Sequence, residues 1–427
     1  MFVKKKICLQ LFLLTKHTNL CIHNWRKEVI EVMFQIILRG GVIIDPSQKI
    51  NKMGSVAISN GKIVAIGNDI SDAKAEKVFD LDGKIIAPGL IDIHCHPADG
   101  IVSLGCPPDE IGLNRGVTTL CDAGSTGAAN FGTMRRYVIE PAKTDIFCFL
   151  HLANTGLITL PWNDELWDEH DISIDYSKQV IEANRDIIKG IKIRAVQSLA
   201  DGLGIKGVEI AKKLSNDVNL PLMMHIGIHR NHIPNDRMDD FSRAAVSLLE
   251  EGDILSHYLT WESGGLILKD GTVYPELEAA KKRGVILDSC HGLNHFSFAI
   301  ARHAIAKGLI PTVISSDMVS IVLPVAQSLS VIMSKFISLG LTLDQVVEMA
   351  TFNPARALGE ENKRGGLKPG MIADITVMEL QKGDYIFGDG GGGEIIHGEA
   401  LLEPRMVFKA GEVMPAYSGY HIPPACS

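Results

Sequence analysis

The sequence has no excess of basic residues over acidic ones. Its 42 lysines and arginines are outnumbered by 50 aspartates and glutamates, giving a formal net charge of −8 and a pI of about 6.0. Nucleic-acid-binding domains usually present a basic face, so we expect no nucleic-acid partner. Apolar runs as long as the roughly 18 residues of a membrane span are also missing, so we expect no membrane partner.

Cysteine pairs of the CxxC type are absent as well. The eight cysteines are scattered, and several of them, such as Cys121, Cys148 and Cys290, lie inside apolar runs. Buried free thiols in a reducing compartment explain this pattern better than disulfides do, which predicts a cytoplasmic protein. Nothing nearby suggests an activated thiolate, so we interpret Cys95, Cys121 and Cys290 as packing residues.

A glycine-rich phosphate fingerprint after an early strand is also lacking. The run GDGGGGE at 388–394 follows no such strand and opens no helix, so it is typical of a flexible loop. This absence argues against a doubly wound, nucleotide-binding sheet.

The N-terminal segment needs a separate interpretation. MFVKKKICLQLFLL begins like a weak signal peptide, but Gln10 interrupts its apolar stretch and no small-residue cleavage site follows. We expect Met33 to be the natural start and residues 1–32 to be an upstream extension outside the fold, with a weak signal peptide as the alternative.

The two ends of the remaining chain are rich in short β-type runs. Residues 33–87 contain several of them, and Asn60-Gly61 between two runs is a strong hairpin signal. Residues 361–427 hold a second β-rich stretch. We predict that both ends pair into one small β-sandwich domain.

The middle of the chain, residues 88–360, follows a different pattern. Strand-like apolar runs recur there, most of them roughly 30 residues apart, which leaves room for a helix between neighbours. They cover 89–94, 116–124, 145–151, 188–196, 220–227, 253–259, 284–292 and 309–317. Candidate helices lie at 175–190, 205–218 and 275–284. Eight alternating units predict an α/β fold, a (β/α)8 TIM barrel.

Polar residues gather at the ends of these runs, where barrel enzymes place their chemistry. Strand alternation puts His94 and His96 on one face of the first strand, with Ile91, Ile93 and Cys95 on the other, packed against helices. The same alternation turns Lys192 and Arg194 of the fourth strand inward if their isoleucine neighbours meet the helices.

Three further polar residues end later strands: His225, His257 and Asp317. Imidazole and carboxylate groups are typical ligands of zinc, manganese, nickel or iron. A buried ammonium is costly, so Lys192 must lose its charge or find anions. A neutral lysine can react with CO2 to form a carbamate, whose two oxygens can bridge two metal ions.

This set of residues resembles the ligand pattern of the amidohydrolase superfamily. Binuclear members carry HxH after strand 1, a carboxylated lysine after strand 4, histidines after strands 5 and 6, and an aspartate after strand 8. The matching positions are, in the same order, His94, His96, Lys192, His225, His257 and Asp317. APGLIDIHCH (87–96) is similar to the superfamily's entry into the barrel, and residues 353–377 to its exit. The resemblance covers about residues 34–415.

Within the superfamily, GVTTLCDAGSTG, IKIRAV and DSCHGLNHFSF are similar to dihydroorotase-like deacetylases, some of which remove acetyl groups from N-acetyl or O-acetyl carboxylic acids. Dihydroorotases usually carry an arginine two residues after the second histidine, where this chain has Ala98. That arginine would bind the substrate carboxylate, and Arg194 is a candidate replacement. An equally acceptable interpretation pairs Arg194 with a structural carboxylate.

The resemblance implies a homo-oligomeric hydrolase with two divalent ions, most simply Zn²⁺. His94 and His96 would hold a buried ion and His225 and His257 an exposed one. A carbamate on Lys192 and a hydroxide would bridge the ions, and Asp317 would bind the buried ion and act as general base and acid. The substrate would be a small acylated carboxylic acid.

Other residues and functions stay open at this point. His291 is a candidate contact for the substrate or the oxyanion, whereas we interpret His229, His232 and His295 as ordinary histidines. Asp122 and Ser125 fit a turn. The alternatives to a deacetylase are a cyclic amide hydrolase of dihydroorotase or hydantoinase type and a non-catalytic scaffold on the same fold.

Overall fold

A computed structural model describes residues 34–421, except for 69, 72–74, 161, 163, 228–235 and 391–392. The predicted extension at 1–32 and the loop histidines His229 and His232 lie outside the described residues. Among the described residues, no helix is long and apolar enough to cross a membrane.

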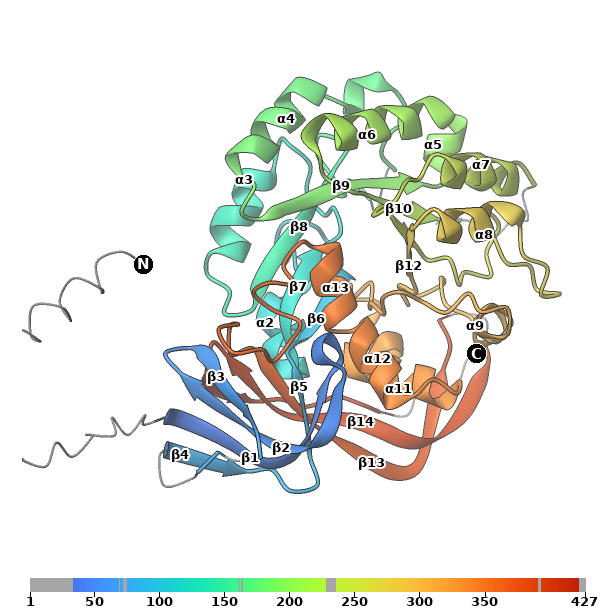
Figure 1. Ribbon diagram of the computed structural model, residues 1–427. Coiled ribbons are helices and arrows are strands. Elements are labelled where there is room, and N and C mark those ends of the chain that lie inside the picture. Colours follow the sequence, from blue (N-terminus) through green and yellow to red (C-terminus); the bar gives the residue numbers. More distant parts are fainter. Residues whose placement is uncertain are drawn as a thin grey trace, which may run out of the picture. The chain divides into compact units, whose positions relative to one another are not determined.

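The central part is a curled parallel sheet with helices around it (Figure 1). Its hydrogen-bonded order is β12-β11-β10-β9-β8-β7-β6. The strands are β6 (Leu90–Cys95), β7 (Val117–Asp122), β8 (Asp145–His151), β9 (Ile188–Ala195), β10 (Leu222–Ile226), β11 (Ile254–Ser256) and β12 (Ile286–Asp288). Single parallel bridges join Val313 to Asp288 and Met318 to Cys95, so the eighth segment lies between β12 and β6. The predicted TIM barrel is confirmed.

The helices follow the predicted alternation. α6 (Ile205–Val218) matches the expected helix residue for residue, because its buried Val208, Ala211 and Leu214 recur every three or four residues. It ends at Asn219 in the left-handed conformation, with φ of 52°. α4 (Ile174–Ala183) and α8 (Pro275–Lys282) are shorter than predicted.

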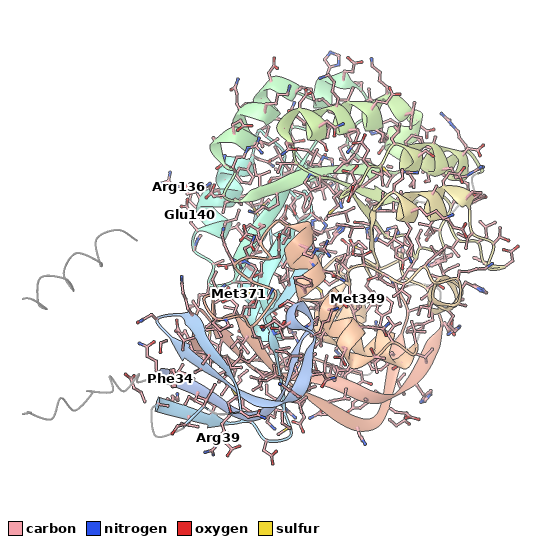
Figure 2. All side chains as sticks on the ribbon, in the orientation of Figure 1. Phe34, Arg39, Arg136, Glu140, Met349 and Met371 are labelled. Atoms are coloured by element: carbon pink, nitrogen blue, oxygen red, sulfur yellow. The ribbon has the colours of Figure 1, made fainter. Side chains whose placement is uncertain are left out.

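The other helical segments are short or follow the barrel strands. They are η1 (Pro46–Gln48), α2 (Pro108–Ile111), η3 (Leu113–Arg115), α3 (Phe131–Met134), η4 (Arg135–Ile139), η5 (Glu169–Asp171), α5 (Gln197–Asp201), α7 (Asp236–Ser247), α9 (Phe298–Ala306), α10 (Leu323–Ala326), α11 (Leu329–Ser338), α12 (Leu343–Met349) and α13 (Phe352–Ala357). Figure 2 shows Arg136 and Glu140 at the periphery, and both are exposed, while the Val138 and Ile139 between them are buried.

Both ends of the described chain contribute to a second sheet, as predicted. Its order is β15-β14-β13-β5-β1-β2-β3, with β4 also paired to β1. The strands are β1 (Phe34–Asp45), β2 (Ile50–Ser59), β3 (Lys62–Gly67), β4 (Ala75–Asp80), β5 (Ile85–Pro88), β13 (Ile375–Gly388), β14 (Ile395–Lys409) and β15 (Glu412–Pro415). Asn60 and Gly61 form the predicted hairpin turn, with φ of 53° and 69°.

The chain passes from this sheet into the barrel at Gly89, between β5 and β6. A Cβ atom at this position would lie 2.2 Å from Thr118 Oγ1 of β7. Only glycine therefore permits this close approach. His94, the first of the predicted ligand histidines, follows five residues later, so the crossing positions the start of the candidate site.

The expected side-chain alternation of β6 is wrong. The register with β7 shifts between Asp92 and Cys95, which marks a bulge. Ile91 and Ile93 consequently pack inside the barrel with the inner side chains Phe149 and Met223, and not against the helices. Single-strand alternation could not predict this, because the shift is set by pairing with the neighbouring strand.

Asp92 joins β6 to the eighth segment of the barrel. Its buried carboxylate accepts hydrogen bonds from Ser316 Oγ (2.5 Å), Ser316 N (3.1 Å) and His94 N (3.3 Å). The carboxylate thus holds the strand that carries His94 beside the strand that carries Asp317.

Replacing Asp92 with alanine should lower the free energy of unfolding by about 1–3 kcal/mol, because the buried donors of Ser316 and His94 lose their acceptor. Urea denaturation measures the effect. Asp82→Ala, at an exposed position of the second sheet, is the control and should change stability by less than about 0.5 kcal/mol. Equal stability of the two variants would contradict a role for Asp92 in closing the barrel.

Candidate metal centre

Six predicted side chains converge at the C-terminal ends of the barrel strands. Lys192 Nζ lies 3.0 Å from His94 Nε2. Asp317 Oδ1 lies 3.3 Å from His96 Nε2 and 3.7 Å from His94 Nε2, and Oδ2 lies 3.9 Å from His257 Nε2. The centroid of the His225 ring lies 4.2 Å from the centroid of the His257 ring. Four imidazoles, one amine and one carboxylate therefore share one small space.

Each of three imidazoles has its Nδ1 atom occupied by a protein acceptor. His94 Nδ1 lies 3.2 Å from Asp288 Oδ2 and 3.0 Å from Ser256 Oγ. His96 Nδ1 lies 2.8 Å from Ser125 Oγ, and His257 Nδ1 lies 2.9 Å from the Cys290 carbonyl. When Nδ1 donates to such a partner, Nε2 is the atom left to bind a metal ion. This is the usual arrangement of metal-binding histidines.

Two buried nitrogen atoms of this group make no hydrogen bond to any described residue: Nε2 of His225 and Nε2 of His257. Leaving a buried polar atom unbonded costs about 1–3 kcal/mol, so such an atom calls for a partner. Burial also lowers the pKa of both imidazoles well below the usual range, which keeps them neutral. Neutral, unbonded imidazole nitrogens fit divalent metal ions.

Lys192 is almost completely buried, with an exposed fraction of 1%. Burial lowers its pKa to about 8. Gly124, at the end of β7, leaves room for the side chain, because a Cβ atom there would lie 2.6 Å from Lys192 Cγ. The surroundings therefore accommodate this lysine while disfavouring its charged form.

Backbone strain is concentrated at this centre. His257, Cys290 and Asp317 have φ angles of 65°, 32° and 51°, in a region that non-glycine residues rarely adopt. Each such residue costs of order 1–3 kcal/mol and persists only where the surroundings hold it in place. Such strain is typical of functional sites.

A cavity opens directly above these groups. Its polar lining includes Arg194, His295 and five of the six ligand candidates, namely His94, His96, Lys192, His225 and Asp317. The opposite walls are apolar and come from Leu104, Leu157, Leu293, Val319, Ile321 and Val322. The site therefore has one charged end and an apolar enclosure, as small-molecule sites commonly have.

Arg194 pairs with a buried carboxylate, which is one of the two interpretations made from the sequence. Its Nη1 atom donates to Glu165 at 3.0 Å and 2.9 Å. Burial alone would raise the pKa of Glu165, but the charge of Arg194 and the contact with His151 lower it to about 2. Arg194 Nη2 is buried and makes no hydrogen bond to a described residue. The guanidinium is thus anchored through Nη1, whereas Nη2 lacks a hydrogen-bond partner among the described residues.

His291 lies apart from this group. Its Nδ1 atom donates to the Gly292 carbonyl (2.9 Å), and Lys335 Nζ of α11 donates to its Nε2 atom (2.9 Å). The ring is completely buried, stacks on Phe296 and does not line the cavity. The structure does not bring the predicted substrate contact to the site.

Lys335 makes stability depend on pH. Burial lowers its pKa to about 7, opposed only by the charge of Asp389, and His291 is the other titratable group at its amine. An unfolded lysine has a pKa near 10.4. Between about pH 7 and pH 10 the unfolded chain therefore binds a proton that the folded chain does not, so the free energy of unfolding rises with pH.

Lys335→Met should reduce the increase in the free energy of unfolding between about pH 7 and pH 10 by an amount on the order of 4 kcal/mol. Urea denaturation at pH 7, 8, 9 and 10 measures the slope. Lys307→Met, at an exposed position, is the control and should keep the wild-type slope. A Lys335→Met variant with an unchanged slope would rule out this titration.

Several residues near the centre were not predicted: Ser256, Asp288, Cys290 and His295. Asp288 sits on the inner face of β12 and accepts from Ser256 and Ser315. A carboxylate on an inward-facing strand position was the signal available in the sequence. The His295 ring lies 4.3 Å from that of His257 and 4.8 Å from that of His225. His295 lies in a loop, so the periodicity of strands and helices could not predict this contact.

The fold and the site together define a class of protein: a metal-dependent hydrolase on a TIM barrel. A match to the amidohydrolase family spans residues 85–414. The chain is 35% identical over 361 residues to Deacetylase Atu3266 of Agrobacterium fabrum, covering 84% of this chain and 85% of the relative. A deacetylase of Enterococcus faecalis is 28% identical, with 82% and 93% covered.

Solved structures agree with this assignment. A crystal structure of a dihydroorotase superposes with a TM-score of 0.80 at 31% identity and covers 91% of this chain and 99% of that one. An adenine deaminase superposes with the same TM-score at 26% identity, covering 90% and 100%. The chain belongs to the amidohydrolase family.

Proposed function

We propose that this protein removes an acetyl group from an N-acetyl or O-acetyl carboxylic acid. The observation that carries the proposal is the convergence of six ligand-type side chains next to a cavity that is also lined by Arg194, whose Nη2 atom has no hydrogen-bond partner among the described residues. Curated relatives named deacetylases support the choice of reaction.

Two divalent ions, most simply Zn²⁺, fit the donor set. His94, His96 and Asp317 would hold one ion, and His225 and His257 would hold the other. Lys192 would contribute carbamate oxygens, once its neutral amine has added CO2 and released a proton. When bound, the ions supply an activated water at neutral pH and polarise the scissile carbonyl.

The residues of the chain manage the proton and the substrate. Asp317 takes the proton of the attacking water and delivers it to the leaving nitrogen or oxygen, as general base and then general acid. Its Oδ1 atom lies 3.3 Å from His96 Nε2, within the group of candidate ligands. Arg194 Nη2 binds the substrate carboxylate, a role filled by a different arginine in dihydroorotases, and Ala98 leaves that position empty of charge.

Metal analysis combined with a substrate screen tests the proposal. The purified protein should contain divalent metal and should hydrolyse N-acetyl-D- or L-amino acids or acetylated hydroxy acids faster than cyclic ureides. Faster turnover of dihydroorotate or hydantoins would favour the cyclic amide hydrolase instead. A carefully purified sample without bound metal would favour the non-catalytic scaffold.

Arg194→Lys should raise KM for acetylated acids by about 10- to 100-fold, because the planar, two-armed donor is lost while the positive charge beside Glu165 is kept. The measurement compares an acetylated acid with its methyl ester. Selective loss on the free acid is expected, and an equal loss on both substrates would speak against carboxylate binding. Arg302→Lys, on the exposed side of α9, is the matched control.

A further inference from the structure

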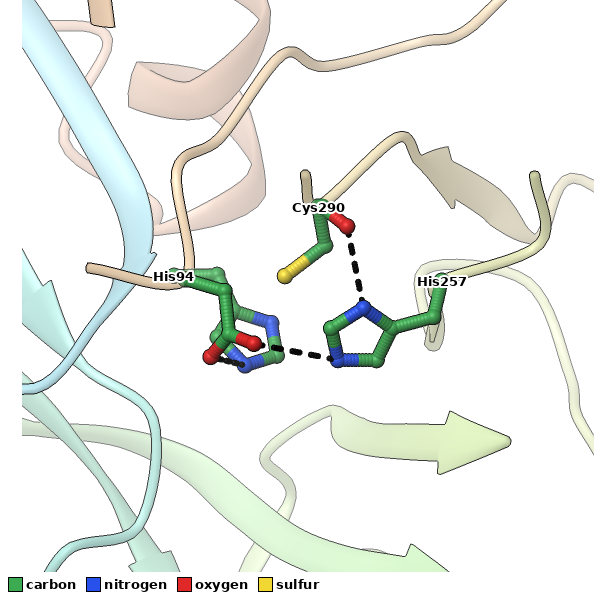
Figure 3. A group of neighbouring side chains, drawn as sticks. His94, His257 and Cys290 are labelled. Carbon is green, nitrogen blue, oxygen red and sulfur yellow. Dashed lines mark hydrogen bonds and ion pairs between the residues drawn. The ribbon is translucent and has the colours of Figure 1, made fainter. Parts of the chain in front are cut away.

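We propose that Cys290 supplies a thiolate ligand to the metal centre. This inference rests on the proposed metal-dependent function and adds a ligand of a different chemical type. His94, His257, Cys290 and Asp317 each offer one ligand atom, and these four atoms all lie within 4.8 Å of one another. His94 and Asp317 are proposed above for one ion and His257 for the other, so the thiolate would lie within reach of both ions. Figure 3 shows the sulfur atom directed toward the space between the imidazoles of His94 and His257.

The spacing of these atoms suits a metal ion. Zinc binds sulfur at about 2.3 Å and imidazole nitrogen at about 2.0–2.1 Å, so tetrahedral ligand atoms are separated by roughly 3.3–3.7 Å. A separation of 4.8 Å, the upper limit within this group, would therefore have to shorten by roughly 1.1–1.5 Å for two of the atoms to bind the same ion. Side-chain torsions can supply that movement without a change of fold.

The backbone holds Cys290 in this position through hydrogen bonds to the other ligands. Its carbonyl oxygen accepts from His257 Nδ1 at 2.9 Å. Its amide nitrogen donates to Asp288 Oδ1 at 3.2 Å, and the second oxygen of Asp288 lies 3.2 Å from His94 Nδ1. The turn is thus linked to two candidate ligands, which explains how the φ of 32° is maintained.

An unbonded neighbour provides independent support. His257 Nε2 is completely buried, faces this group and makes no hydrogen bond within the described part of the chain. By contrast, Cys95 lies in sequence between two ligand histidines, yet its thiol points to the Cys121 carbonyl at 3.5 Å. Position in the fold therefore distinguishes Cys290 from the other buried thiols.

Metal binding converts the thiol into the ligand. The S–H bond breaks, the metal–sulfur bond forms, and the proton leaves to solvent. A thiolate among imidazoles and carboxylates favours zinc over harder ions such as Mg²⁺ or Mn²⁺. The centre should accordingly retain zinc when it competes with those ions.

X-ray absorption at the zinc edge tests the proposal on the intact, zinc-loaded protein. The wild type should show a sulfur neighbour at about 2.3 Å beside nitrogen and oxygen neighbours at about 2.0–2.1 Å. Cys290→Ser should lose the sulfur neighbour and bind zinc about tenfold or more weakly. Cys121→Ser, which changes another buried thiol of the barrel interior, should keep both properties.

Two results overturn the inference, and they differ in what else they reject. A wild-type protein that holds zinc and hydrolyses its substrate but shows no sulfur neighbour contradicts the role of Cys290 alone. A protein that binds no metal and hydrolyses nothing rejects the proposed function together with it. The wild-type spectrum decides even if Cys290→Ser does not fold, and cobalt-loaded wild type should show a thiolate charge-transfer band as a second readout.

Discussion

Replacing Lys192 with alanine should lower kcat/KM by at least about 1,000-fold and reduce the bound metal below two ions per chain. Lys192 Nζ lies 3.0 Å from His94 Nε2 in a completely buried position, so no neighbouring side chain can take its place. If the lysine carries the bridging carbamate, its removal deletes two anionic oxygens and leaves neighbouring ligand groups facing an empty space.

The Lys192 experiment measures metal content and steady-state kinetics on the same preparations. Lys206→Ala, which removes an exposed lysine paired with Glu169, is the control and should retain full activity. Added acetate, which also offers two carboxylate oxygens, should restore part of the lost activity. A Lys192→Ala variant that is fully active and carries its full metal content would falsify the scheme.

Replacing Asp317 with asparagine should lower kcat by about 100- to 10,000-fold, the range expected for loss of a general acid and base. Asparagine has nearly the same shape and can still lie beside His96, but its amide cannot take up the proton. The metal content should fall less than in Lys192→Ala, because Lys192, the residue proposed to bind both ions, remains.

A substrate with a good leaving group separates proton transfer from a structural effect of Asp317. An acetylated phenol needs less help from an acid than an acetylated amine does, so the variant should lose less activity on the phenol ester. Asp99→Asn, an exposed position close in sequence, is the control. Equal losses on both substrates would indicate that Asp317 does not donate the proton.

Local patterns in the sequence were enough to predict many elements. The apolar spacing of α6 predicted its full length, because an amphipathic helix is specified by residues within one or two turns of each other. The rim of polar residues followed from a rule of topology: the C-terminal ends of parallel strands meet at one face of a barrel. For that reason His94, Lys192 and Asp317 could be grouped although they are far apart in the chain.

Features that depend on contacts between distant segments were not predictable in the same way. The bulge in β6 reverses the expected direction of Ile91 and Ile93, since its register is set by β7. His291 follows β12 as expected, but Lys335 of α11 holds it away from the cavity. The sequence of a single strand does not indicate how it will pair with β7 or that Lys335 of α11 will contact His291.

By itself, the sequence determined the class of fold, the family and the six residues proposed as metal ligands, because these depend on periodicity and on residue types at strand ends. Only the tertiary structure decided which nitrogen of Arg194 pairs with Glu165 and which has no hydrogen-bond partner among the described residues. It also decided where His291 lies and that Cys290 lies beside His94 and His257. These outcomes depend on backbone angles such as the φ of 32° at Cys290 and on hydrogen bonds across the barrel. Such contacts form only when all the strands are in place.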